Sequence, residues 1–147
     1  MILRPHHLLD IITGLGHGLN YTAHPYGHSQ HLVAARLLAN PTQPVTFVLG
    51  ADDICTGCCH LRADRSCDDV LRQLDPPPGK QAYNDGLDAR LFPLLGIVPG
   101  DNLPLPEYLA RVQALLPGLE LICSHPGEEP AERLAGLQAG LRLFGLG

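Results

Sequence analysis

The sequence predicts an α+β protein: a mainly helical single domain with one or two short strands and a cysteine-rich loop. Three observations support this fold class. The chain has 147 residues, a length typical of one domain. Apolar residues recur at helical spacing in several segments. Residues 45–49 form a run rich in β-branched side chains that ends at Gly50, which is typical of a strand. We therefore expect residues 1–147 to form one domain without internal repeats.

Helices are expected where apolar stripes coincide with start and stop signals, over residues 4–12, 29–39, 81–92, 106–116 and 130–144. Pro5 suits the first position of its helix, and Gly14 can end that helix. Ser29 is a candidate N-cap for the second helix, and Pro93 and Gly96 close the third. A helical turn is expected over residues 68–74. The short apolar segment 119–123 could be a strand or a helix.

Composition and charge exclude several classes of protein. The formal net charge is −5, and no run of Lys or Arg marks a nucleic-acid-binding surface or contact with an anionic membrane. No apolar segment reaches the 18 residues of a membrane span. The first residues lack the apolar region and cleavage site of a secretory signal. We therefore expect a cytoplasmic protein that binds neither nucleic acid nor membranes.

The strongest chemical signal is a cluster of four cysteines between residues 55 and 67. Cys55 and Cys58 form a C-x-x-C pair on a turn that Gly57 allows to bend, so both sulfurs could reach one metal ion. Cys67 is close enough to return as a third ligand. Thiols stay reduced in the cytoplasm, where clustered cysteines are more often metal ligands or redox groups than disulfides.

The fourth ligand and the metal are left open by the residues alone. The candidates for the fourth ligand are Cys123, Cys59, His60 and the N-terminal pair His6 and His7. Thiolates suit Zn²⁺ and iron–sulfur clusters alike. One short-spaced pair with scattered single cysteines favours a cluster slightly, because structural zinc sites usually combine two such pairs.

Two alternatives compete with a cysteine-ligated metal centre. A strand leads into the C-x-x-C, as it does in thioredoxin-like proteins, so Cys55 and Cys58 could form a thiol–disulfide redox pair. Asp52 and Asp53 argue against this, because negative charge should raise the pKa of the attacking thiol. The other alternative is a metal-dependent enzyme in which His6 or His7 completes a Cys/His site with bound water.

The histidines and the acidic pair could have functional roles or only structural ones. Asp10 shares a helical face with His6 or His7 and could orient an imidazole for metal binding or proton transfer. Asp52 and Asp53 are expected to shape the cysteine loop by accepting backbone hydrogen bonds rather than to act as a catalytic pair. The histidines of the loop and helix 17–31 are expected to be largely solvated.

Several motifs resemble an uncharacterised prokaryotic family of cysteine-rich proteins, a domain of unknown function thought to bind iron–sulfur. They are the Arg-Pro-His-His-Leu-Leu start at residues 4–9, the Asp-Asp-Ile-Cys-x-x-Cys motif at 52–58, Cys67, and Leu-Ile-Cys at 121–123. The resemblance implies metal ligands at Cys55, Cys58, Cys67 and Cys123, and gives weight to His6 and His7.

This chain departs from the family pattern at four places. Asp10 stands where the family has a cysteine, Cys59 replaces a proline after the C-x-x-C, and Pro126 occupies the place of another cysteine. The cysteine-bearing C-terminal segment is replaced by the helix predicted from Pro130. We therefore expect one four-cysteine centre holding an iron–sulfur cluster or Zn²⁺. A cluster would imply electron transfer with a redox protein partner, and closed zinc would imply a structural role. Neither the residues nor the resemblance fixes a reaction.

Overall fold

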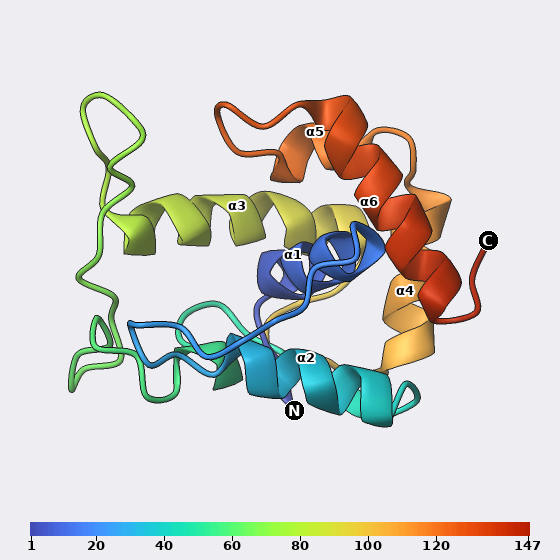
Figure 1. Ribbon diagram of the computed structural model, residues 1–147, viewed down its shortest axis with the longest axis horizontal. Coiled ribbons are helices and arrows are strands. Elements are labelled where there is room, and N and C mark those ends of the chain that lie inside the picture. Colours follow the sequence, from blue (N-terminus) through green and yellow to red (C-terminus); the bar gives the residue numbers. More distant parts are fainter.

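Helix α1 lies at the centre of the fold, surrounded by the other elements (Figure 1). The computed structural model describes all 147 residues. α1 spans Pro5–Gly16 and starts with Pro5, as predicted, because proline has no N–H to leave unpaired in the first turn. Leu8, Leu9, Ile11 and Ile12 of this helix are fully buried. His6 and Thr13 on the polar side of this helix are buried as well, so other elements cover α1 on more than its apolar face.

The remaining helices are α2 (Gln30–Ala39), α3 (Lys80–Leu95), α4 (Leu105–Ala114), α5 (Leu119–Cys123) and α6 (Pro130–Leu143), with a 3₁₀ turn η1 at Asp53–Cys55. The mainly helical α+β prediction is confirmed. No helix combines the length and the apolar character that crossing a membrane requires.

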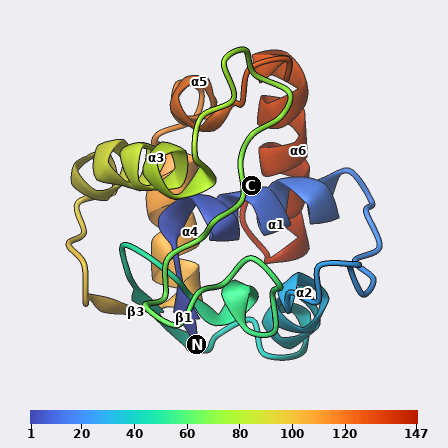
Figure 2. The same ribbon diagram turned by 90° about the vertical axis from the view of Figure 1, so that its left-hand side faces the viewer.

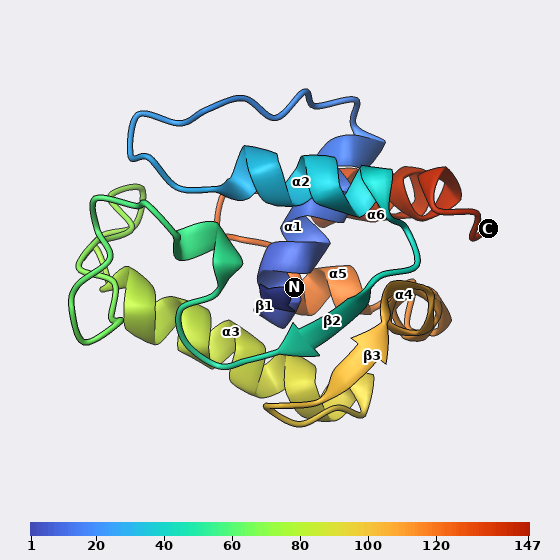
Figure 3. The same ribbon diagram turned by 90° about the horizontal axis from the view of Figure 1, so that it is seen from below.

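A small three-stranded sheet lies at one side of α1 (Figure 3). Its strands are β1 (Ile2–Leu3), β2 (Pro44–Phe47) and β3 (Asn102–Pro104), in the order β1-β2-β3. β2 pairs in parallel with β1 and antiparallel with β3. The sequence predicted β2 but neither β1 nor β3, because segments of two or three residues are too short to show a period-two pattern.

α1 is longer than predicted, and its last turn packs against α6 through glycine. A Cβ added at Gly16 would overlap the backbone oxygen of Gly136, and one at Gly140 would overlap that of Ile12. The two backbones therefore approach each other more closely than side chains would allow. The expected helix end at Gly14 was wrong: α1 continues to Gly16, and the side chain of Tyr21 fills the space beside Gly14.

Two further expectations were corrected in detail. α3 continues through Pro93 and ends at Gly96, whose left-handed backbone (φ 65°) forms the C-cap. Residues 68–74 form no helical turn. They belong to an irregular segment with two isolated bridges, Leu61 to Cys67 and Val70 to Gly79. Segment 119–123, left open between strand and helix, is the short helix α5.

The core joins the sheet to the helices through two aromatic side chains. Phe47 of β2 stacks on Tyr108 of α4, with ring centroids 4.5 Å apart. The Tyr108 hydroxyl donates a hydrogen bond to the backbone oxygen of Pro5 at 2.9 Å. Apart from Ile54, which belongs to the core, the segment from η1 to α3 lies outside the core cluster and runs along one side of the molecule (Figure 2). It carries the cysteine cluster.

Candidate metal centre

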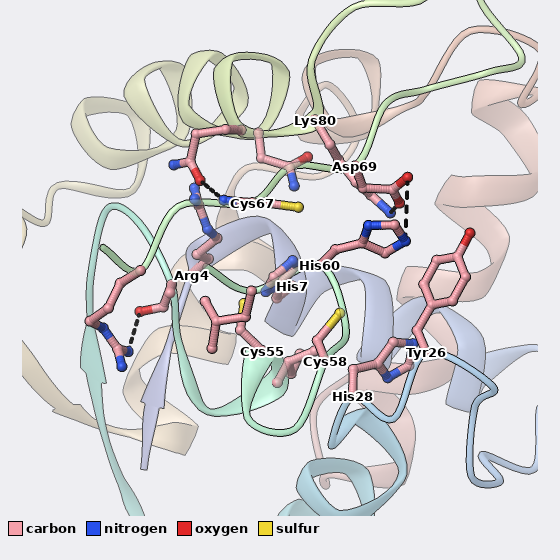
Figure 4. Close-up of a pocket in the computed structure, with 16 residues that line it drawn as sticks. Arg4, His7, Tyr26, His28, Cys55, Cys58, His60, Cys67, Asp69 and Lys80 are labelled. Carbon is pink, nitrogen blue, oxygen red and sulfur yellow. Dashed lines mark hydrogen bonds and ion pairs between the residues drawn. The ribbon is translucent and has the colours of Figure 1, made fainter. Parts of the chain in front are cut away.

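Three of the four predicted cysteine ligands line one cavity. Cys55, Cys58 and Cys67 lie around a space of about 100 Å³, and we call it the cysteine cavity. His7 and His60, both predicted as secondary ligands, line it too. Figure 4 shows these side chains around the cavity, contributed by α1 and by the loop between β2 and α3.

Local backbone geometry explains how Cys55 and Cys58 come together. Cys55 ends the turn η1, and the N–H of Cys58 donates to the Cys55 backbone oxygen at 3.0 Å. Between them, Gly57 has a φ of 82°, a conformation that glycine adopts without strain. A Cβ there would also stand 2.6 Å from the oxygen of Gly27. The prediction that Gly57 bends this turn is confirmed.

Cys67 returns to the cavity through a short loop. Leu61 and Cys67 form an antiparallel bridge, and the Cys67 N–H donates to the side chain of Gln81 in α3 at 2.9 Å. This hydrogen bond thus connects Cys67 to α3, on the opposite side of the cavity from the C-x-x-C turn.

Asp52 fixes His7 at the edge of the cavity. The carboxylate accepts a hydrogen bond from Nδ1 of His7 at 2.8 Å, and this leaves Nε2 of the ring free. Burial by itself would lower the pKa of His7, but the charge of Asp52 and this hydrogen bond outweigh burial and raise it. Metal-bound histidines typically have such a carboxylate partner on the other nitrogen.

His60 is held in a similar way. Its Nδ1 donates to Asp68 at 2.8 Å, and its Nε2 stands 3.9 Å from Asp69. The ring packs edge-on against Tyr26. Because Asp69 lies close to Nε2 of His60, this nitrogen is less available to bind a metal than Nε2 of His7. Cys59, in contrast, is exposed and is absent from the lining of the cavity.

The structure does not bring Cys123 to the cysteine cavity. Cys123 ends α5 and is only 1% exposed. Its sulfur accepts a hydrogen bond from Nε of Arg133 in α6 at 3.2 Å. Burial raises the pKa of this thiol, although the charge of Arg133 opposes the shift. In this position Cys123 acts as a core side chain between α5 and α6.

His6 faces a second cavity next to the first. Its Nδ1 donates to Asp88 of α3 at 2.9 Å, and Asp88 also accepts from the His6 N–H and from Arg4. Burial and the neighbouring His7 lower the pKa of His6, although Asp88 opposes the shift. This second cavity, of about 310 Å³, is also lined by His7, Asp10 and His125; we call it the histidine cavity.

The acidic pair has the structural role expected from the sequence. Asp52 accepts hydrogen bonds from the N–H groups of Arg4 and Ile54, and Asp53 accepts one from Ile2. Sequence reasoning missed the role of Asp52 as the partner of His7, because 45 residues separate them. It also missed Asp88 and His125, which no local motif marks.

The donor set of the cysteine cavity suits a metal, because three thiols and an imidazole are ligands for Zn²⁺ and for iron–sulfur clusters. No group of three or more His, Cys, Asp or Glu side chains is already arranged to hold an ion.

Comparison of the chain with protein-family models, with curated proteins and with solved structures gives no match.

Proposed function

We propose that the protein binds a metal through a cysteine-ligated centre in the cysteine cavity. The ligands are Cys55, Cys58 and Cys67, with Nε2 of His7 as the fourth. The observation that supports the proposal most is the convergence of three predicted cysteine ligands on one cavity beside a histidine with a carboxylate partner. The four-cysteine set with Cys123, implied by the resemblance, is replaced because Cys123 lies elsewhere.

His7 is preferred over His60 because its free nitrogen has no competing partner. Asp52 holds His7 through Nδ1 and is itself only 2% exposed. The same carboxylate stands 3.6 Å from the sulfur of Cys55. One buried acidic group therefore contacts two proposed ligands from different segments, and its hydrogen bond with His7 orients the imidazole.

The ligand set is compatible with two kinds of centre. Three cysteines and one histidine form a closed Zn²⁺ site of the structural type. A bound iron–sulfur cluster would supply one-electron transfer and would require a redox protein partner. We place the protein in the reducing cytoplasm, because thiols remain available as ligands there and all five cysteines are free.

The thiol–disulfide alternative is weaker at this site. Burial, together with the charge of Asp52, raises the pKa of Cys55 to about 11, whereas redox-active cysteines have lowered values. Cys55 also ends a 3₁₀ turn instead of starting a helix whose N-terminus would stabilise a thiolate. A metal removes this difficulty, because coordination displaces the proton from the thiol.

The test is metal analysis and an optical spectrum on protein purified without oxygen. We expect at least one zinc ion, or iron with sulfide and visible absorption, per chain, and a thiolate charge-transfer band when Co²⁺ replaces zinc. Cys67→Ser should abolish this thiolate-bound metal, whereas the matched variant Cys59→Ser should retain it. Cys123→Ala should also retain it. Metal loss in Cys123→Ala with an intact fold would contradict the ligand set, and metal-free wild-type protein would contradict the function.

A further inference from the structure

A second group of metal-ligating side chains lies outside the cysteine cavity. His6 and Asp10 are one helical turn apart on α1, and His125 follows α5. All three line the histidine cavity. Nε2 of His125 stands 4.0 Å from Oδ2 of Asp10. We call these three residues the His6–Asp10–His125 cluster.

Every member of the cluster is held by a partner on the side away from the cavity. Nδ1 of His6 is hydrogen-bonded to Asp88 at 2.9 Å. Nδ1 of His125 and the hydroxyl of Tyr83 are 3.2 Å apart. Oδ1 of Asp10 accepts from Arg133. These contacts leave Nε2 of both histidines and Oδ2 of Asp10 without a hydrogen bond, and such outer partners characteristically orient metal ligands.

The charges around the cluster favour a divalent cation. Arg4 is paired with two carboxylates, Asp85 and Asp88. Arg133 is likewise paired with two, Asp10 and Glu128. Lys80, which also lines the histidine cavity, is paired with Asp69, so four carboxylates face two guanidinium groups and an excess of two negative charges remains. A bound ion of charge +2 would balance them.

We propose that the His6–Asp10–His125 cluster is a second metal site, which binds one divalent transition-metal ion through two imidazole nitrogens and one carboxylate oxygen. Two ligand atoms on a tetrahedral ion are about 3.4 Å apart, given metal–ligand distances of about 2.1 Å. The 4.0 Å between His125 and Asp10 is therefore somewhat too long, and the three atoms do not yet enclose an ion. The proposal therefore requires His125, which is 30% exposed in an irregular segment, to move toward Asp10 when the ion binds.

This ligand set differs in chemistry from the set of ligands proposed for the cysteine cavity. Two histidines and one carboxylate leave further coordination positions open, as in catalytic zinc and non-haem iron sites. Those positions face a cavity of about 310 Å³, large enough for a small polar molecule beside the ion. Because no cysteine takes part, the site can be tested in a chain that lacks the three thiols, although His7 lines both cavities.

The test is a titration with Co²⁺ alone, in a chain carrying Cys55→Ser, Cys58→Ser and Cys67→Ser. We expect one Co²⁺ per chain, with visible d–d absorption and no thiolate charge-transfer band. His125→Ala should weaken binding about 100-fold or more, and the matched control His24→Ala, at an exposed histidine outside both cavities, should bind normally. Tyr83→Phe should weaken binding about 10-fold with an unchanged circular dichroism spectrum.

A chain without the three cysteines that is folded and takes up no Co²⁺ would overturn the proposal. Equal affinity in His125→Ala and His24→Ala would also overturn it. If the triple-serine chain does not fold, the same pair is compared with all cysteines present. His125→Ala should then hold one Co²⁺ fewer per chain than His24→Ala after dialysis, and equal metal contents would overturn the proposal.

Discussion

The carboxylate of Asp52 accepts a hydrogen bond from the ring of His7 at 2.8 Å and thereby connects α1 to the cysteine loop. It also accepts the backbone N–H groups of Arg4 and Ile54, at 2.7 and 3.0 Å. Burial by itself would raise the pKa of Asp52, but His7 and these donors lower it. The first helix and the loop that bears Cys55 therefore share one buried, ionised group.

Replacing Asp52 with asparagine should destabilise the protein. The amide keeps the size of the side chain but removes the charge and one acceptor oxygen, and hydrogen bonds to charged groups contribute about 1.5–3 kcal/mol. We expect the free energy of unfolding in urea to fall by about that amount. The matched variant Asp53→Asn affects one exposed hydrogen bond to Ile2 and should cost less than about 1 kcal/mol. Equal losses in the two variants would refute the connecting role of Asp52.

The close approach of α1 and α6 predicts opposite effects for two glycine-to-alanine changes. Gly16→Ala places a methyl group against the backbone of Gly136 and should destabilise the protein by about 1–3 kcal/mol or more. Gly86→Ala lies in α3 with open space around it and should stabilise it by about 0.5–1 kcal/mol, because alanine favours a helix. Thermal unfolding of both variants measures the difference. A neutral Gly16→Ala would contradict the glycine contact.

Tyr108 predicts a loss of stability in alkali. Burial raises the pKa of its hydroxyl well above the ordinary value of 10.0. Above about pH 10 the unfolded chain releases this proton while the folded chain keeps it, so the free energy of unfolding falls by about 1.4 kcal/mol per pH unit. The stabilisation is fully present below pH 10 and disappears as the pH rises toward the folded pKa.

Tyr108→Phe isolates this contribution. At pH 7 the variant should be about 0.5–1.5 kcal/mol less stable, because it loses the hydrogen bond to Pro5. Near pH 11 the deficit should vanish or reverse, since phenylalanine releases no proton. Urea unfolding of both proteins at the two pH values gives the comparison. A deficit that is independent of pH would show that Tyr108 does not resist ionisation.

The raised pKa of Cys55 predicts slow alkylation of the metal-free protein. With a pKa of about 11, few Cys55 thiols are ionised at pH 8. The higher nucleophilicity of a basic thiolate offsets part of this loss. We expect iodoacetamide to react with Cys55 about 10-fold or more slowly in the folded chain than in urea, as measured by mass spectrometry of the peptides. Faster reaction in the folded chain would favour the thiol–disulfide alternative.

Local signals in the sequence predicted much of the helical framework. Pro5 starts α1, and the helix predicted over residues 106–116 is α4, which buries Leu105, Tyr108, Leu109 and Val112. Contacts between distant segments were not visible in the sequence. Gly14 did not end α1, which continues to Gly16, where the helix meets the backbone of α6.

The candidate site likewise has one part that the sequence predicted and another that only the tertiary structure assembled. The sequence by itself determined the cysteine loop, because the C-x-x-C spacing, Gly57 and the aspartates act within a few residues of one another. Only the tertiary structure decided which ligands meet. It placed Cys123 beside Arg133 in the core, and it brought His7 to Asp52 and His125 to Asp10. The physical reason is that turns and caps depend on neighbouring residues, whereas a ligand set is assembled from segments that only the packing of helices brings together.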